Sequence, residues 1–266
     1  MRRRFGGLLL VAALIGLGIA FADDDDGAAR ARAERLPAGA ARRAPDRRAA
    51  HVVLLGRSVK GRPIRAVVLG DPNTPTTALV VGCIHGNEPA GITVVDRVRG
   101  WTPPPGIALW LVSDLNPDGR AADTRQNAHG VDLNRNFPYR WQPLGPAGSQ
   151  QYAGSRPLSE PETRIAHSLI LRLRPRLTIW FHQPLGVTDS SSGNVRLERR
   201  FATLSRLPLR RLPRYPGSIT TWQDSRLRDG TAFVVELPPG RSPPRAVERY
   251  ARAVEQLVAE AAGGSG

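Results

Sequence analysis

Residues 78–91, ALVVGCIHGNEPAG, place an apolar run directly before a short polar turn and a proline. The run over 78–84 is typical of a buried strand, and the apolar spacing after Pro89 is typical of an amphipathic helix. His85 and Glu88 therefore fall in a strand-to-helix turn. In open α/β sheets such turns lie at the carboxyl edge of the strands, where ligands bind. The stretch predicts an α/β fold with its polar chemistry at this edge.

Strand and helix patterns alternate along the rest of the chain. In order, they predict a hairpin over 51–70, a strand over 107–112, a helix that starts in a capping box at 159–162, strands over 177–181 and 232–235, and a helix over 242–261. Residues 116–119 indicate tight turns, and the poorly patterned region from 182 to about 228 indicates loops. This alternation predicts a single-domain α/β sandwich, with a twisted, mixed and largely parallel sheet flanked by helices.

The two ends of the chain have a different composition. Three arginines, an apolar run over 8–21 and a small-residue site before four aspartates are typical of a signal peptide cleaved after Ala22. An uncleaved anchor is the alternative, although the run is short for a membrane span. We therefore predict a signal peptide at 1–22, a disordered linker at 23–50, a catalytic domain at 51–262 and a disordered tail at 263–266. The mature protein is expected to be exported, to the periplasm, the cell wall or the medium, without a membrane span.

Composition limits the classes of partner. A content of 41% hydrophobic and 23% charged residues is ordinary for a globular core. The net charge of +15 comes from arginines spread along the whole chain, with Lys60 as the only lysine. No basic helix or strand-borne aromatic pair accompanies them, so a nucleic acid partner is not predicted. Cys83 is the only cysteine, which excludes an internal disulfide, and the oligomeric state stays open.

A metal site would need a third ligand besides His85 and Glu88. Catalytic zinc typically has three protein ligands, as in His₂Glu sites, and leaves one position for water. Of the five histidines, only His182 also ends an apolar strand pattern, so it is the candidate third ligand. Glu236 ends another such strand and reaches the same sheet edge. Taken alone, a His and a Glu three residues apart also fit an ordinary hydrogen-bonded turn.

The loop RQNAHGVDLNRNFP, residues 125–138, contains two arginines between the candidate metal ligands. The planar fork of an arginine matches a carboxylate through two parallel hydrogen bonds. Arg135 beside Asn134 would suit a terminal carboxylate of a substrate, and Arg125 could stabilise charge on a carbonyl oxygen. A purely structural loop held by arginine hydrogen bonds explains the same residues equally well.

Eight short motifs in a fixed order strengthen the enzymatic interpretation. They are LGRSVKGRPI at 55–64, HGNEPAG at 85–91, NPDGR at 116–120, GVDLNRNFP at 130–138, PLSEPETR at 157–164, FH at 181–182, GSITTW at 217–222 and VVELP at 234–238. Together they resemble the M14 family of zinc carboxypeptidases, and most closely its bacterial murein peptide amidase branch. The resemblance implies a twisted mixed sheet flanked by helices.

The resemblance also implies a set of catalytic roles. One zinc ion per chain would be held by His85, Glu88 and His182. Glu236 would act as the general base, and Arg125 would stabilise the oxyanion. The chain departs from digestive carboxypeptidases in its shorter domain, which suggests trimmed loops and a more open cleft.

Substrate recognition follows from the same resemblance. Asn134 and Arg135 would bind the substrate carboxylate, and Tyr215 is the candidate for the tyrosine that caps the substrate. Tyr215 stands only three residues before Ser218, closer than the family usually has it. Ile219 occupies the position where the family's pocket floor often lies, which argues against a preference for basic side chains.

The expected function is hydrolysis of an amide bond next to a residue with a free carboxylate, in peptidoglycan stem peptides. Three alternatives stay open: a general secreted metallocarboxypeptidase, an N-acyl amino acid hydrolase of the desuccinylase or aspartoacylase type, and an inactive zinc-binding cell-wall module. The signal peptide pattern and the motif PLSEPETR argue against the second. The presence of Glu236 and Arg125 argues against the third.

Overall fold

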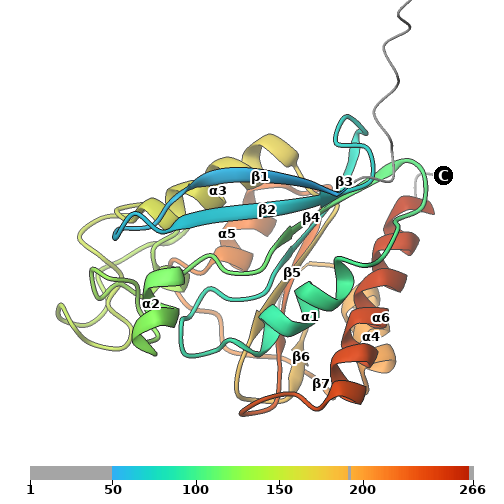
Figure 1. Ribbon diagram of the computed structural model, residues 1–266. Helices are drawn as coiled ribbons and strands as arrows, with labels where there is room; N and C mark the ends of the chain where they lie inside the picture. Colours follow the sequence, from blue (N-terminus) through green and yellow to red (C-terminus); the bar gives the residue numbers. More distant parts are fainter. Residues whose placement is uncertain (1–49, 191–192, 264–266) are drawn as a thin grey trace, which may run out of the picture. The chain divides into compact units, whose positions relative to one another are not determined.

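The structure is a computed structural model that describes residues 50–190 and 193–263 (Figure 1). The predicted signal peptide, the linker up to residue 49 and the tail beyond residue 263 lie outside these residues. The described elements run from His51 to Gly263. Within this part of the chain, none of the helices is both long and apolar enough to cross a membrane.

A mixed sheet of eight strands forms the centre of the described domain. The strands are β1 His51–Arg57, β2 Pro63–Leu69, β3 Thr76–Val81, β4 Ile107–Val112, β5 Leu177–His182, β6 Val187–Asp189, β7 Leu209–Arg210 and β8 Thr231–Glu236. Their order is β1-β2-β4-β3-β5-β8-β6-β7. The pairs β4–β3, β3–β5, β5–β8 and β6–β7 are parallel, and the other three pairs are antiparallel. The predicted fold class, a mixed and largely parallel α/β sheet, is confirmed.

The first two strands form the predicted hairpin. They are antiparallel, with His51 opposite Val68 and Arg57 opposite Pro63. Gly61 closes the connection with a φ of +76°, and its amide N–H donates to the carbonyl oxygen of Ser58 at 2.9 Å. A positive φ is costly for residues with a Cβ atom, so glycine suits this turn.

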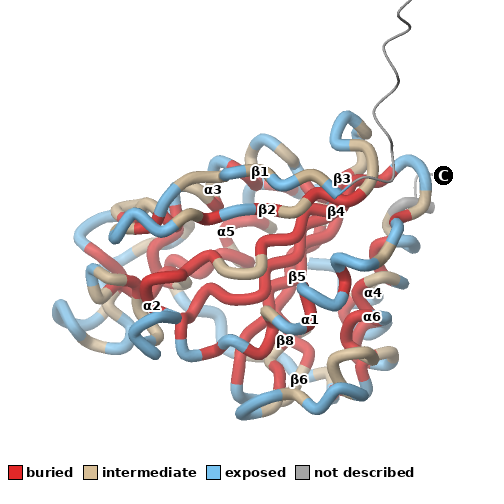
Figure 2. Tube along the Cα trace, in the orientation of Figure 1, coloured by how far each residue is buried: buried red, intermediate tan, exposed pale blue. Residues whose placement is uncertain are grey.

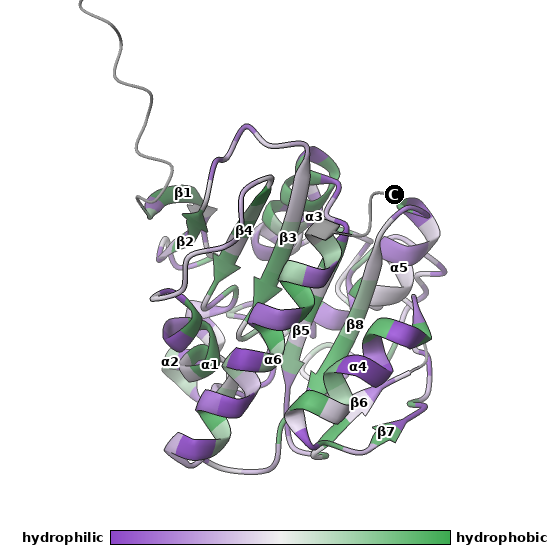
Figure 3. Cartoon of the chain, turned by 90° about the vertical axis from the view of Figure 1, so that its right-hand side faces the viewer, coloured by the Kyte–Doolittle hydropathy of each residue, from purple (hydrophilic) through white to green (hydrophobic). Residues whose placement is uncertain are grey.

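Helices cover both faces of the sheet. They are α1 Ala90–Val98, α2 Pro117–Ala122, α3 Pro161–Leu173, α4 Val195–Ser205, α5 Ile219–Arg226 and α6 Pro244–Gly263, with a short 3₁₀ turn η1 at Leu133–Arg135. Apolar side chains of α1, α4 and α6 pack on one face, and those of α3 and α5 pack on the other. Figure 3 shows the first group of helices in front of the hydrophobic central strands.

The central parallel strands are buried on both faces, which explains their continuous apolar sequences. Every residue of β4 and β5 is buried, and Figure 2 shows these strands in the red interior of the domain. Successive side chains of a strand point to opposite faces. Accordingly, Trp180 packs in the core under α3 and α5, while Phe181 packs under α1, α4 and α6. Apolar clusters on both faces of the sheet therefore hold the carboxyl ends of the central strands in place.

Two local expectations about the region before α3 were wrong. Residues 117–122 form helix α2, because Asn116 accepts the N–H of Gly119 at 3.0 Å and Pro117 starts the first turn. The capping box before α3 does not form, since Glu160 is the N-cap residue and makes no side-chain cap bond. The carboxylate of Glu162 instead accepts the N–H of Val59 at 3.0 Å. Long-range hydrogen bonds therefore replace the local ones.

The region expected to be loops contains β6, α4, β7 and α5. Helix α4 is rich in arginine and buries only a narrow face, on which Phe201 is fully buried. The overall hydrophobicity of this helix is low, although its few apolar residues keep helical spacing, so the helix depends on tertiary packing. The two short strands extend the sheet beyond β8, and Asp189 at the end of β6 lines the cavity described below.

Candidate active site

The turn that carries His85 and Glu88 is held by close backbone packing. A Cβ atom on Gly86 would lie 2.0 Å from the carbonyl carbon of Gly119, so only glycine fits there. Asn116 Nδ2 also donates to the carbonyl oxygen of Ile84 at 3.1 Å. The loop that follows β4 therefore fixes the turn that follows β3, as expected for neighbouring parallel strands.

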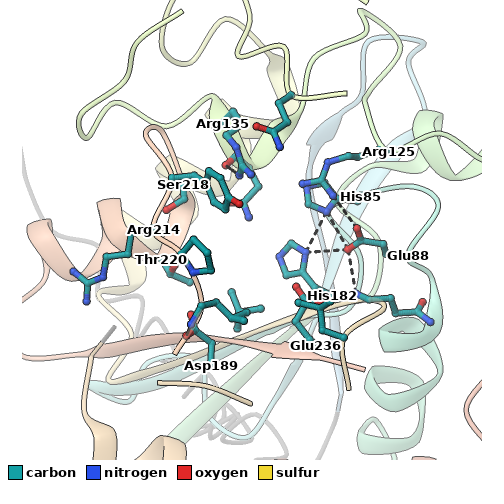
Figure 4. A pocket seen from close by; sticks show the side chains of 18 of the residues that line it. His85, Glu88, Arg125, Arg135, His182, Asp189, Arg214, Ser218, Thr220 and Glu236 are labelled. Carbon is teal, nitrogen blue, oxygen red and sulfur yellow. Dashed lines mark hydrogen bonds and ion pairs between the residues drawn. The ribbon is translucent and has the colours of Figure 1, made fainter. Parts of the chain in front are cut away.

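His85, Glu88 and His182 converge on one point (Figure 4). Glu88 Oε2 lies 3.0 Å from His85 Nδ1 and 3.0 Å from His182 Nδ1, and the two Nδ1 atoms are 3.1 Å apart. All three residues are buried. His182 comes from the last position of β5, as the sequence pattern predicted. The structure therefore brings together the three predicted metal ligands.

These three ligand atoms fit a zinc ion. Two imidazole nitrogens and one carboxylate oxygen are the donor set of many catalytic zinc sites. A tetrahedral zinc ion with ligand distances of about 2.0–2.1 Å holds its ligands about 3.3–3.4 Å apart, close to the separations found here. Two imidazole nitrogens that face each other also need a shared proton or a cation between them. The arrangement is consistent with the zinc site of an M14 enzyme.

Asp132 is a residue of the site that the sequence analysis missed. Its Oδ1 lies 3.0 Å from His85 Nε2, and its side chain is fully buried. A carboxylate at this position accepts the Nε2–H of His85 and leaves the Nδ1 lone pair directed at the metal position. Its place two residues before Asn134, in a loop already singled out, was the available signal.

Neighbouring charges shift the pKa values of His85, Glu88 and Asp132. Burial lowers the pKa of His85, but the carboxylates of Asp132 and Glu88 outweigh this effect and hold the pKa above its usual value. Burial raises the pKa of Asp132 and of Glu88, but their neighbours outweigh this effect and hold both pKa values well below the usual range. The neighbours are His85 and His182 for Glu88, and His85 and the two arginines Arg125 and Arg135 for Asp132. The carboxylates are therefore ionised at neutral pH.

Arg125 is tied to the metal ligands. Its Nη1 donates to Glu88 Oε1 at 2.9 Å, and its Nε donates to Asp132 Oδ2 at 2.9 Å. These contacts orient the carboxylates and place the guanidinium on the wall of the cavity. A guanidinium has five N–H donors, so these two bonds leave others for a substrate.

Glu236 faces the metal ligands from the neighbouring strand. It ends β8 and pairs in register with His182 of β5. Both residues line the cavity, and Glu236 Oε2 is buried without a hydrogen-bond partner in the described part of the chain. Burial raises the pKa of Glu236, and the charge of Glu88 adds to this effect. Glu236 is therefore placed as a group that can exchange protons beside the metal position.

Asn134, Arg135 and Tyr215 lie together on another wall of the same cavity. The guanidinium of Arg135 stacks on the ring of Tyr215 at 4.1 Å from its centroid. Asn134 Oδ1 accepts the N–H of Ile219 at 2.9 Å, which ties this loop to the start of α5. Gly217, with a φ of +69°, lets its backbone approach that of Arg135. The predicted carboxylate-binding residues thus face the metal ligands across one cavity.

The expected pocket floor at Ile219 was wrong. Ile219 is fully buried in the core between the sheet and α5, and the cavity is lined instead by Thr220 and Thr221. The first turn of α5 rotates the isoleucine toward the sheet because the apolar residue gains more from burial. The argument against a preference for basic side chains therefore no longer holds.

Glu198 of α4 is a buried carboxyl group outside the metal centre. Its side chain is fully buried, and in the described residues neither carboxyl oxygen has a hydrogen-bond partner. Burial, together with the charges of Asp189 and Asp224, raises its pKa from an ordinary 4.5 to about 8. The folded protein keeps Glu198 protonated in a pH range where the unfolded chain ionises it.

Glu198→Gln is therefore expected to stabilise the protein at alkaline pH. In the wild type, the free energy of unfolding falls as pH rises from the unfolded pKa of Glu198 to its folded pKa. Glutamine does not ionise, so the variant does not lose stability in this way. It should be more stable than the wild type by about 1–3 kcal/mol near pH 8, with little gain near pH 5. Calorimetric melting at both pH values measures the difference. An equal difference at both values, or a gain equalled by Glu260→Gln at the surface, contradicts the assignment.

Comparison with known proteins agrees with this geometry. Residues 106–184 match the family model described as zinc carboxypeptidase. The chain is 32% identical over 218 residues to murein peptide amidase A of Escherichia coli K12, which covers 76% of this chain and 87% of that protein. It is 30% identical over 197 residues to murein peptide amidase A of Vibrio campbellii, covering 69% and 78%.

Solved structures show the same fold. The crystal structure of a murein-tripeptide amidase from Escherichia coli O157 superposes with a TM-score of 0.65 and 28% identity, over 80% of this chain and 93% of that one. Carboxypeptidase A of Helicoverpa armigera superposes with a TM-score of 0.67 at 18% identity, over 81% and 69%, and shows the fold alone. With its His-x-x-Glu pair and distant histidine in place, this chain belongs to the M14 family of zinc carboxypeptidases.

Proposed function

We propose that this protein is an exported zinc-dependent amidase that cleaves an amide bond next to a residue with a free carboxylate, in peptidoglycan stem peptides. One observation carries the proposal. A single cavity of about 320 Å³ is lined by His85, Glu88 and His182, by Glu236, and by the carboxylate-binding candidates of the 125–138 loop. The similarity to murein peptide amidases supports the choice of substrate.

One zinc ion per chain would be held by His85, Glu88 and His182. When bound, zinc lowers the pKa of a coordinated water and polarises a carbonyl group. Asp132 would keep His85 in the tautomer that such an ion requires. His85 and Glu88 lie in the turn after β3, and His182 ends β5. Both segments are anchored to the central sheet, so the site would be formed before substrate arrives.

Glu236 would carry the proton in the reaction. It would accept a proton from the attacking water and donate it to the amine of the leaving residue. Arg125 would donate a hydrogen bond to the carbonyl oxygen as negative charge develops there. Both side chains line the cavity beside the metal ligands, so neither has to travel to reach a bound substrate.

Asn134 and Arg135 would hold the free carboxylate of the leaving residue. Arg135 is largely buried, and its Nε is buried without a hydrogen-bond partner among the described residues. A buried donor without a partner is costly, and a carboxylate ligand would supply the missing acceptor. Tyr215, which stacks on Arg135, would cover the bound residue from the solvent side.

Export and substrate choice are further parts of the proposal. Export rests on the signal peptide pattern at 1–22, and it would bring the enzyme to peptidoglycan. In the murein tripeptide, the leaving residue is diaminopimelate with a free α-carboxylate. A general carboxypeptidase would use the same catalytic groups on ordinary peptides, so substrate comparison has to separate the two.

The test compares matched substrates with free and amidated carboxylates. Murein tripeptide and an ordinary peptide are each offered in both forms, and kcat/KM is measured for each. The free forms should be cleaved at least about tenfold faster, which corresponds to about 1.4 kcal/mol of transition-state binding. Equal cleavage of free and amidated forms contradicts the proposal. A preference for the ordinary peptide would identify a general carboxypeptidase.

Two variants of Arg135 sharpen this test. Arg135→Ala should abolish the preference for the free carboxylate, and Arg135→Lys should keep only part of it, because lysine lacks the planar fork. The exposed Arg252 of α6 provides the control, since Arg252→Ala removes one positive charge far from the cavity. If Arg252→Ala reduced the preference as much as Arg135→Ala, the effect would come from net charge rather than from the fork.

A further inference from the structure

The cavity has a second charged end, away from the metal ligands. Asp189 and Arg214 line it there, together with Thr220, Thr221 and Val234. In Figure 4, Asp189 and Arg214 lie on the side opposite Glu88 and Arg125. The roles assigned so far use neither residue. A substrate held by its carboxylate at Arg135 and by its amide at the metal would extend its side chain toward this end.

Strand pairing directs Asp189 to the cavity. In the antiparallel pair β6–β8, Val187 lies opposite Glu236 and Thr188 lies opposite Val235. Cross-strand partners share a face of the sheet, and faces alternate along each strand. Asp189 is therefore on the same face as Glu236, the face that bears the site, whereas Thr188 points to the opposite side.

The carboxylate of Asp189 is fixed in a poorly solvated position. Only 4% of the residue is exposed, and Oδ1 accepts the N–H of Leu212 at 3.0 Å. A buried carboxylate gains most from an opposite charge, because water screens it little. The negative charge of Asp189 also acts on neighbouring groups, because it helps to raise the pKa of Glu198 and of Asp224. This end of the cavity therefore attracts a cation.

Arg214 contributes the opposite charge on the outer side. It is exposed, it lines the same cavity as Asp189, and its charge acts on Glu198 and Asp224 across this region. An exposed arginine remains hydrated and can pair with a carboxylate at the cavity mouth. The cavity thus offers an inner negative group and an outer positive group, and Thr220, Thr221 and Val234 also line it.

We propose that Asp189 and Arg214 select a leaving residue whose side chain ends in both an ammonium and a carboxylate group, as that of diaminopimelate does. Asp189 binds the ammonium, and Arg214 binds the distal carboxylate. The proposal rests on the proposed amidase function and specifies its substrate class. It makes Asp189 and Arg214 determinants of specificity, with no part in the chemical step.

Four substrates vary the two charges one at a time. Each is L-Ala-γ-D-Glu-X with a free α-carboxylate, where X is diaminopimelate, lysine, 2-aminopimelate or norleucine. Lysine lacks only the distal carboxylate, 2-aminopimelate lacks only the distal amine, and norleucine lacks both. The full-length, zinc-loaded protein should show the highest kcat/KM with diaminopimelate. Loss of the amine should cost about 10- to 100-fold, and loss of the distal carboxylate about 3- to 10-fold.

Two variants assign the charges to residues. Asp189→Asn keeps an acceptor for the N–H of Leu212, so it should reduce cleavage of the diaminopimelate and lysine substrates about 10- to 100-fold and leave the norleucine substrate unchanged. Arg214→Gln should reduce only the diaminopimelate and 2-aminopimelate substrates, about 3- to 10-fold. Cleavage of the norleucine substrate measures the catalytic groups alone, because its side chain carries neither distal charge. Circular dichroism checks the fold of both variants.

The possible outcomes separate this inference from the proposed function. If the wild type cleaves all four substrates equally, or if Asp189→Asn slows all four equally, the inference is wrong while the carboxylate-dependent amidase stands. If none of the four is cleaved, the proposed function fails and this inference fails with it. A loss confined to the substrates with a distal amine supports the role of Asp189.

Discussion

Glu236→Gln is expected to lower kcat about 10³-fold or more while one zinc ion per chain stays bound. The glutamine keeps the size of the side chain and its place at the end of β8, but it cannot accept a proton from water. The zinc ligands are His85, Glu88 and His182, so they remain intact. The Oε2 atom of Glu236 has no hydrogen-bond partner in the described residues, so the substitution breaks no bond at that oxygen. The carbonyl oxygen of the glutamine can still accept the backbone hydrogen bond from Leu185.

Steady-state kinetics and metal analysis of the same sample measure the two parts of this result. The matched control is Glu260→Gln, an exposed glutamate of α6 that pairs with Arg200, and its activity should equal that of the wild type. If zinc is lost together with Glu236, this residue is a ligand and the assignment of roles is wrong. Turnover within tenfold of the wild type would instead exclude Glu236 as the general base.

His182→Ala should remove both the zinc and the activity. Two ligands remain in that variant, and catalytic zinc sites need three from the protein. We expect zinc affinity to fall by more than about 100-fold and turnover to become undetectable. The melting temperature should also lose its dependence on added zinc, because binding to the folded state alone is what stabilises it.

Chelation and reconstitution distinguish this result from simple unfolding. The wild type treated with a chelator should lose activity and recover it when zinc is added back, and His182→Ala should not recover. His51→Ala, at the start of β1 and outside the cavity, is the control for loss of a histidine. Full activity of His182→Ala, or the absence of stoichiometric metal in the wild type, would show that the metal site is wrongly assigned.

Much of this protein could be predicted from its sequence, because the strongest signals are local. The apolar runs at 107–112 and 177–181 form β4 and β5 almost to the residue, since strands buried on both faces must be apolar throughout. The carboxyl ends of parallel strands meet at one sheet edge, so His85, His182 and Glu236 could be placed together before the structure was known.

The tertiary structure alone decided the features that depend on contacts between distant segments. Asp132 reaches His85 across 47 positions of the chain, and no periodicity marks such a contact. Asp189 enters the cavity from β6, a strand of three residues that is too short to leave a pattern. The choice between Ile219 and Thr220 as a pocket residue depends on how α5 rotates against the sheet.

The physical reason is the range of the interactions. Burial of apolar area acts on every residue of an element and leaves a period that a single sequence reveals. A hydrogen bond or an ion pair acts between two atoms, and its partner is known only once the chain has folded. The sequence by itself therefore determined the fold and the residues gathered at the sheet edge, and the tertiary structure decided which partners orient them and which charges face the substrate.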